Sequence, residues 1–232
     1  MGKLTFDITM SLDGFIAGPN PSLERPLGEG GERLHGWLYG LASFRERHGL
    51  EGGTTNADSE ILEESLVSSG ATLMGRRMFS GGQGPWSEDV NADGWWGDDP
   101  PFRMPVFVLT HHPRETLTKG GTSFTFVTGG IEAALEQARA AAGKKDVSVA
   151  GGASVAQQYL EAGLLDELQI HLVPQLLGDG VRLFDNLDTE HIELQGARVM
   201  HSPSVTHVKY RVVKGNELDM ERRRTETSNA HG

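Results

Sequence analysis

The chain has 232 residues, no cysteine, and a formal net charge of −11 from 21 Lys and Arg against 32 Asp and Glu. The acidic balance argues against a nucleic-acid partner, and the lack of Cys excludes disulfides and thiolate chemistry. No apolar run approaches the ~20 residues that a membrane span needs, and the chain enters a strand pattern directly, so we expect a cytoplasmic protein.

The length suits one α/β domain, which we place at residues 1–214. The tail over 215–232 is polar and charged without a period, so we expect it to be disordered or loosely docked. No histidines stand at the i, i+4 spacing of a helical zinc pair, and Cys ligands are absent, so no metal is expected. The chain also lacks a nucleophile-elbow motif and a P-loop signature.

The N-terminal part predicts a strand followed by a long insertion. Residues 4–10 alternate apolar and polar side chains, which is the period of a strand with two different faces. Residues 19–57 are rich in Gly and Pro, with a helical patch over 34–44, and predict an inserted loop or lid. The glycines of 28–31 follow a loop and not a strand, so they are not interpreted as a nucleotide fingerprint.

A helix over residues 56–68 and a short apolar strand over 71–74 are expected next. Asn56 or Asp58 can cap this helix, because both side chains accept hydrogen bonds from free backbone N–H groups. Asp58 is therefore open to two interpretations, a helix cap or a functional acid.

Two cations follow the strand. Gly75 precedes Arg76 and Arg77 at a predicted strand-to-helix turn, and this pattern suits the close approach of an anion. The alternative is that both arginines only solvate the turn.

The loop over residues 81–104 contains Trp86, Trp95 and Trp96 among Gly, Asp and Pro. It cannot be a core strand, and long loops of this kind are often functional. A pocket wall and a subunit contact explain the tryptophans equally well.

The C-terminal half predicts alternating strands and helices. The segment 146–184 has the pattern strand, glycine pair, helix, strand, which is a βαβ crossover. Gly151 and Gly152 fall where the strand's carboxyl end meets a helix N-terminus, so free N–H groups and the helix dipole can face an anion such as a dinucleotide pyrophosphate. The expected elements are strands at 105–109, 124–127, 147–149 and 168–172, helices at 131–142 and 153–162, and a closing antiparallel hairpin of 197–201 with 205–213.

Five motifs together carry a family resemblance: SLDGFIAG at 11–18, MGRRMF at 74–79, FVLTHHPRE at 107–115, VAGGASVAQQYL at 149–160 and LLDELQIHLVPQLLGDGVRLF at 164–184. Over most of residues 3–213 the chain resembles the dihydrofolate reductase-like superfamily, in the branch of the riboflavin-biosynthesis deaminase/reductase C-terminal (reductase) domain. The resemblance implies an α/β three-layer sandwich with a mostly parallel sheet of about eight strands, a C-terminal antiparallel hairpin, an NADPH site across the carboxyl ends of the strands, and a homodimer.

The resemblance also implies positions around the cofactor. It places Ile16 and Ala17 near the nicotinamide, Gly75, Arg76, Arg77 and Met78 near the phosphates, Thr110, His111 and Arg114 on the adenosine 2′-phosphate side, and Gly151, Gly152, Ala153, Ser154 and Val155 under the pyrophosphate.

The function expected from this resemblance is an NADPH-dependent reductase that transfers hydride to a C=N or C=O group of a small heterocyclic or pterin-like substrate. Trp95 and Trp96 are candidate substrate-pocket walls, and Asp13, Asp58 and Glu60 are candidate proton donors. Ala150 stands where the riboflavin-pathway reductases usually carry Glu, which argues against their ribosylaminopyrimidine chemistry. The alternative function is a non-catalytic NADPH-binding dimer that acts as a sensor.

Overall fold

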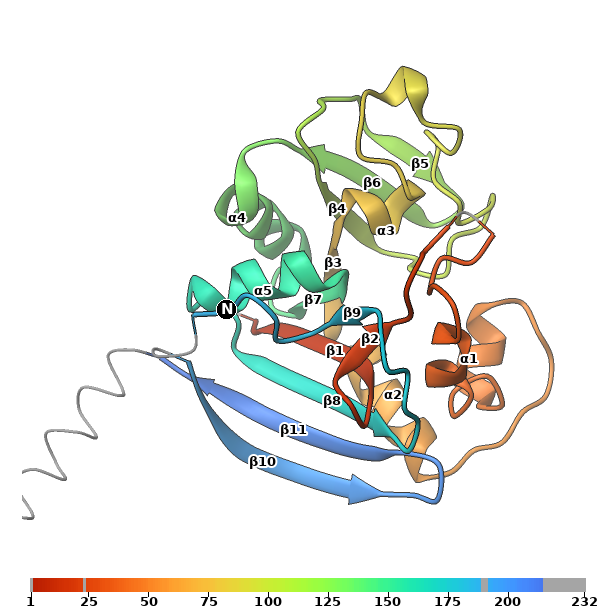
Figure 1. Cartoon of the computed structure of the whole chain (residues 1–232). Coiled ribbons are helices and arrows are strands. Elements are labelled where there is room, and N and C mark those ends of the chain that lie inside the picture. The colour runs from red at the N-terminus through yellow and green to blue at the C-terminus, as the bar shows by residue number, and fades with distance from the viewer. Residues whose placement is uncertain (1, 23, 189–191, 215–232) are drawn as a thin grey trace, which may run out of the picture.

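The computed structural model describes residues 2–22, 24–188 and 192–214, and the predicted tail over 215–232 lies outside them. A mixed sheet runs through the molecule with helices on both of its faces (Figure 1). The strands of the described residues are β1 (Leu4–Ser11), β2 (Phe15–Ala17), β3 (Ser69–Gly75), β4 (Pro105–Leu109), β5 (Leu117–Lys119), β6 (Thr122–Val127), β7 (Asp146–Gly151), β8 (Glu167–Val173), β9 (Val181–Arg182), β10 (Glu193–His201) and β11 (Thr206–Val213). The helices are α1 (Ala42–Arg47), α2 (Ala57–Ser68), α3 (Arg76–Ser80), α4 (Gly130–Ala142) and α5 (Ala153–Glu161), with 3-10 turns η1 (Gly31–His35) and η2 (Trp86–Glu88).

The main sheet has nine strands in the order β10-β11-β8-β1-β7-β3-β4-β6-β5. Its six central strands, β8 to β6, pair in parallel, while β11, β10 and β5 add antiparallel edges. The expected mostly parallel sheet with a closing hairpin is therefore confirmed. Within this sheet, the strand that the sequence did not indicate is β5, which has only three residues and too little alternation to stand out.

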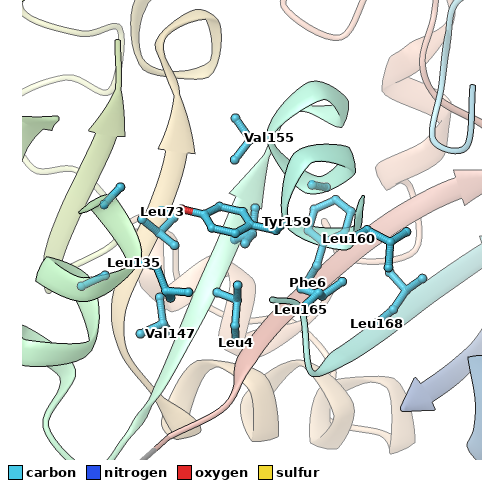
Figure 2. Close-up of a cluster of buried hydrophobic side chains, with 14 of the residues drawn as sticks. Leu4, Phe6, Leu73, Leu135, Val147, Val155, Tyr159, Leu160, Leu165 and Leu168 are labelled. Atoms are coloured by element: carbon cyan, nitrogen blue, oxygen red, sulfur yellow. The ribbon is translucent and has the colours of Figure 1, made fainter. Parts of the chain in front are cut away.

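Helices α4 and α5 cover one face of the sheet. The alternation of β1 turns Leu4 and Phe6 toward α5, where Tyr159 is fully buried among them (Figure 2). The Tyr159 hydroxyl donates a hydrogen bond of 2.8 Å to the backbone carbonyl of Ile131, which satisfies its polar end inside this apolar layer. The β7-α5-β8 crossover expected from the glycine pair is present, with β7 and β8 on either side of β1.

The opposite face of the sheet is polar where α2 lies against it. On β1, Asp7 and Thr9 point to this face, because they alternate with Phe6 and Ile8. The strand register places Thr9 beside His171 of β8 and His171 beside His207 of β11. Three neighbouring strands therefore present polar side chains to one helix.

The insertion over 19–57 packs a second, smaller apolar cluster beside the sheet. The helix predicted over 34–44 is divided: η1 ends at His35, and α1 begins only at Ala42, after turns that contain Gly36 and Gly40. Glycine is a poor helix former, so the apolar spacing alone overestimated the helix. The cluster joins Leu34, Trp37, Leu38 and Leu41 to Val173 of β8 and Val205 before β11.

Asn56 is the N-cap of α2. Its side chain accepts a hydrogen bond of 3.0 Å from the Ser59 amide, and the Ser59 hydroxyl receives one from the Asn56 amide. Of the two candidate caps, Asn56 is therefore confirmed, and Asp58 lies inside the first helical turn. Within the described residues, no helix is both long and apolar enough to cross a membrane.

Candidate active site

Strands β3 and β7 end side by side, with Met74 paired to Gly151. Helices α3 and α5 begin directly after these strands. A methyl group added to Gly75 would lie 3.0 Å from the Val155 side chain and 3.9 Å from the Gly152 nitrogen. The structure thus brings together Gly75, Gly151, Gly152 and Val155, which the family resemblance implies along one cofactor.

The N-terminus of α5 is open. Gly152 is its N-cap, no side chain of the described residues caps it, and its first turn contains no acidic residue. A methyl group added to Gly152 would meet no atom of the described residues within 4 Å. Ala153 and Val155 are buried beneath this turn, whereas Ser154 is exposed. The helix therefore presents its positive end and bare backbone to open space, which is the arrangement that anions occupy in proteins.

The two adjacent arginines point to different surroundings. Arg76 is buried; it pairs with Asp89, donates to the Ser80 hydroxyl, and lies over Trp86 with its guanidinium carbon 3.4 Å from the ring centroid. Its Nε and Nη2 atoms have no hydrogen-bond partner in the described part of the chain. Arg77 is exposed and remains the accessible cation at this turn.

The tryptophan-rich loop is tied to the body of the molecule. Trp86 donates from Nε1 to the His112 carbonyl at 2.9 Å, and Trp95 donates to the Met78 carbonyl at 2.8 Å. Trp96 packs edge-on against Phe102 with ring centroids 4.9 Å apart. All three indoles are half-buried. These contacts explain how the loop is held, and the role of Trp95 and Trp96 as substrate walls stays a prediction.

The residues after β4 form the adjoining part of this edge. Thr110 is buried, and its hydroxyl accepts a hydrogen bond of 3.1 Å from the His112 amide. His111 is exposed. Arg114 pairs with Asp93 at 2.7 Å, so its guanidinium is already engaged by the loop.

Ile16 and Ala17 lie in β2, which pairs with β9 beside the carboxyl end of β1. Ile16 is buried in the main apolar core, and Ala17 is half-buried. Asp13 precedes them and accepts hydrogen bonds from the Ser11 hydroxyl at 2.6 Å and from the Gly178 amide at 2.7 Å.

The Asp13 hydrogen bonds, first the one from Ser11 and then those from the backbone amides, lower its pKa to about 2. A carboxyl group with this pKa is ionised near neutrality and is a poor proton donor. Asp13 therefore holds the β1–β2 turn against the loop at Leu177 and Gly178, and its role as a proton donor stays a prediction.

Asp58 is buried and meets two histidines that the sequence analysis did not single out. Its Oδ1 atom lies 3.1 Å from Nε2 of His207, and Nδ1 of His207 lies 2.6 Å from Nδ1 of His171. Trp37 covers both imidazole rings, with centroid separations of 4.8 Å to His171 and 5.1 Å to His207. Trp37 also donates from Nε1 to the Thr9 hydroxyl at 3.2 Å. We call Asp58, His207 and His171 the Asp–His–His chain.

Glu60, the other acid of the same helical turn, is exposed and outside this chain. The signal for the histidines was present in the alternation of the strands: His171 shares a face with Gln169, and His207 lies on the face opposite Val208. Alternation identifies the face of each strand but not which strands become neighbours. The cluster could therefore not be assembled from the sequence.

Comparison with known proteins matches residues 2–208 to the family model described as the RibD C-terminal domain. A search of curated proteins finds no match. Among solved structures, a putative riboflavin biosynthesis protein from Shewanella sp. PV-4 is 22% identical, with a TM-score of 0.60 over 92% of this chain and 100% of that one.

Two further structures share the fold. A diaminohydroxyphosphoribosylaminopyrimidine deaminase/5-amino-6-(5-phosphoribosylamino)uracil reductase from Thermotoga maritima is 14% identical, with a TM-score of 0.56 over 91% of this chain and 57% of that one. The riboflavin biosynthesis reductase of Saccharomyces cerevisiae is 11% identical, with a TM-score of 0.51 over 91% and 90%. The present chain therefore spans little more than half the length of the Thermotoga protein. From the family match over most of its length, the chain belongs to the RibD C-terminal domain family, and it shares the fold of these three structures.

Proposed function

We propose that the protein is an NADPH-dependent reductase that delivers hydride to a C=N or C=O group of a small pyrimidine- or pterin-like heterocycle. The observation that carries this proposal is the open N-terminus of α5 beside Gly75, where an added methyl group at Gly152 meets empty space. A pyrophosphate fits such a cradle because backbone N–H groups and the helix dipole replace side-chain cations, which this acidic chain has in short supply.

In this proposal the backbone of Gly151 to Ser154 holds the pyrophosphate, and Arg77 supplies the accessible charge for a further phosphate. Ile16 and Ala17 would border the nicotinamide. NADPH, when bound, supplies the hydride. The chain's own task is to orient both reactants, to exclude water, and to hold a proton where the reduced group needs it.

The heterocyclic substrate class is supported by the family and by the pyrimidine named for the Thermotoga relative. Ala150 argues against the same phosphoribosylaminopyrimidine as the substrate. A chain that only senses NADPH is the second candidate. The buried Asp–His–His chain favours catalysis, because linked proton carriers can supply the proton that accompanies hydride transfer.

Calorimetric titration with NADPH and NADH tests the cofactor assignment. Tighter binding of NADPH supports it, and failure to bind either nucleotide would remove it. Oxidation of NADPH in the presence of dihydrofolate or of 5-amino-6-(5-phosphoribosylamino)uracil then tests the reaction. If the protein binds NADPH but oxidises it with neither these two compounds nor a wider set of reducible heterocycles, the sensor is favoured. The homodimer that the family resemblance implies is checked by light scattering on the same samples.

A further inference from the structure

We propose that the Asp–His–His chain is a proton relay whose terminal donor is Nε2 of His171, with His207 and Asp58 as positioning residues. This inference deepens the proposed reductase function and rests on it. The relay would supply the proton that accompanies hydride transfer to the heterocycle.

The geometry of the two rings requires one proton between them. Both facing atoms are Nδ1 nitrogens, and they lie 2.6 Å apart. A hydrogen bond at this distance needs one nitrogen to donate and the other to accept, so the two rings must have complementary protonation at Nδ1. The shared proton can sit on either ring without any movement of the backbone.

Asp58 orients the other end of the chain. Nε2 of His207 lies 3.1 Å from the Asp58 carboxylate and donates to it. When His207 carries protons on both nitrogens, its positive charge lies beside this carboxylate and its Nδ1–H donates to His171. His171 then has its proton on Nε2, which is the outer end of the chain.

The outer end of the chain makes no further hydrogen bond. In the described residues, Nε2 of His171 has no hydrogen-bond partner, and His171 as a whole is 5% exposed. His171 also lies next to Thr9 of β1 near the carboxyl edge of the sheet, and β7, which ends in the glycine pair, is the next strand along. The relay thus ends toward the same carboxyl edge of the sheet as the proposed cofactor cradle, on the face opposite to α5.

The charges around the rings favour a transient extra proton over a permanent one. Burial, followed by the charges on His207 and His35, lowers the pKa of His171 to about 3. Burial also lowers the pKa of His207, although Asp58 opposes this, and Arg198 of β10 adds to the lowering. At neutral pH both rings are therefore mostly neutral, and His207 beside Asp58 is the better place for an added charge.

The proton transfer balances in one concerted step. The Nε2–H bond of His171 breaks, and its proton joins the nitrogen or oxygen of the C=N or C=O group whose carbon receives the hydride. The Nδ1 proton of His207 moves to Nδ1 of His171, and His207 returns to its neutral form with Nε2–H donating to Asp58. A proton from solvent at Nε2 of His171 restores the starting state by the reverse shift.

Nitrogen-15 NMR of histidine-labelled protein tests the relay without any substrate. The expected result is an N–H···N hydrogen bond between the two Nδ1 atoms, seen as coupling across it, with opposite tautomers on the two rings. Glu60→Gln, the control in the same helical turn, should leave these signals unchanged. Two rings that are both protonated at Nε2, with no coupling, would overturn the proposal.

Single-turnover NADPH oxidation across pH separates the relay from a structural role, using the probe that the wild type reduces. Asp58→Asn keeps a hydrogen-bond acceptor for His207 but removes the charge that stabilises its protonated form. We expect the rate of hydride transfer to fall by about 10²-fold or more. The decline of this rate at high pH should begin at a lower pH than in the wild type, and NADPH affinity should be unchanged. Glu60→Gln should alter the rate less than twofold.

His171→Phe keeps a ring beside Trp37 and removes the terminal donor, so it should be as slow as Asp58→Asn even where it is fully folded. An unchanged pH profile in both variants would refute the relay while leaving the reductase assignment intact. Loss of NADPH binding in the wild type would instead reject the proposed function. If the wild type binds NADPH but reduces no probe, the NMR result alone accepts or rejects the proton-sharing pair.

Discussion

Arg76 of α3 and Asp89 of the tryptophan-rich loop form an ion pair whose side chains are only 7% and 4% exposed. Burial alone would raise the pKa of Asp89, but hydrogen bonds from Ser80 and Arg76 outweigh it and lower this pKa. The pair joins the loop to the turn that carries Arg77. It also commits one of the two arginines to the fold and leaves the other for a ligand.

Loss of one partner of this ion pair should destabilise the folded protein. Asp89→Ala leaves the buried Arg76 guanidinium without its counter-charge, and we expect it to reduce the free energy of unfolding by about 3–5 kcal/mol. The matched control is Asp93→Ala, which breaks the pair with Arg114 where Asp93 is 67% exposed, and it should cost about 0–1 kcal/mol. Urea unfolding of both variants measures the difference, and equal costs would show that burial of the Arg76 pair is not what matters.

Arg77 should determine how tightly phosphate groups bind at this turn. Arg77→Gln removes the exposed cation, and the loss of a charge-assisted hydrogen bond is worth about 1.5–3 kcal/mol, or roughly a ten- to hundredfold weaker NADPH complex. Lys144→Gln makes the same change of charge in the turn before β7, at the opposite edge of the sheet, and should leave affinity unchanged. Calorimetric titration of both variants with NADPH measures the two affinities. Similar losses of affinity would show that net charge matters, and not a contact between Arg77 and a phosphate.

Gly152→Val should disable cofactor binding and leave the fold in place. Gly152 has a φ of −83°, which other residues adopt, and an added methyl group meets no atom of the part of the chain that the structure describes within 4 Å. The space that the side chain would enter is the space proposed for the pyrophosphate, so NADPH affinity should collapse. Gly196→Val, at another site with open space, is the control. Normal NADPH binding by a folded Gly152→Val protein would place the pyrophosphate elsewhere.

Asp7 should make the protein less stable as pH rises. It lines a polar hollow of about 140 Å³ between β1, β8 and α2, and burial raises its pKa to about 6 although the Ser65 hydroxyl opposes this. The folded state therefore binds the Asp7 proton more tightly than the unfolded state. The resulting stabilisation is complete below the usual pKa of 3.8 and is lost as pH rises through about 6.

The Asp7→Asn variant tests this linkage. Above pH 6 it should be more stable than the wild type by on the order of 1 kcal/mol, because no charge is then buried, and the gain should shrink toward pH 4. Glu63→Gln, on the exposed side of α2, controls for net charge. Urea unfolding measures the free energy of unfolding of each variant across pH. A stability gain in Asp7→Asn that is the same at every pH would contradict the proposed titration of Asp7.

The sequence by itself determined the order and type of most elements and the place of the glycine pair. Alternation of period two and helical spacing are local properties, so β1, β4, β7, α4 and α5 could be predicted closely. The same local patterns missed β2, β5 and β9, which are three residues long or shorter and depend on a partner strand.

Only the tertiary structure decided the partners of the charged groups. Asp58, His171 and His207 are separated by up to 149 residues in the chain, and they meet because β8 pairs with β11 while α2 covers both. The same holds for Arg76 and Arg77: adjacent residues whose roles differ because one side chain turns toward Asp89 and the other toward solvent. Strand pairing and the burial of ion pairs depend on contacts between residues that are far apart in the sequence. The local periodicity of the sequence carries no information about these contacts.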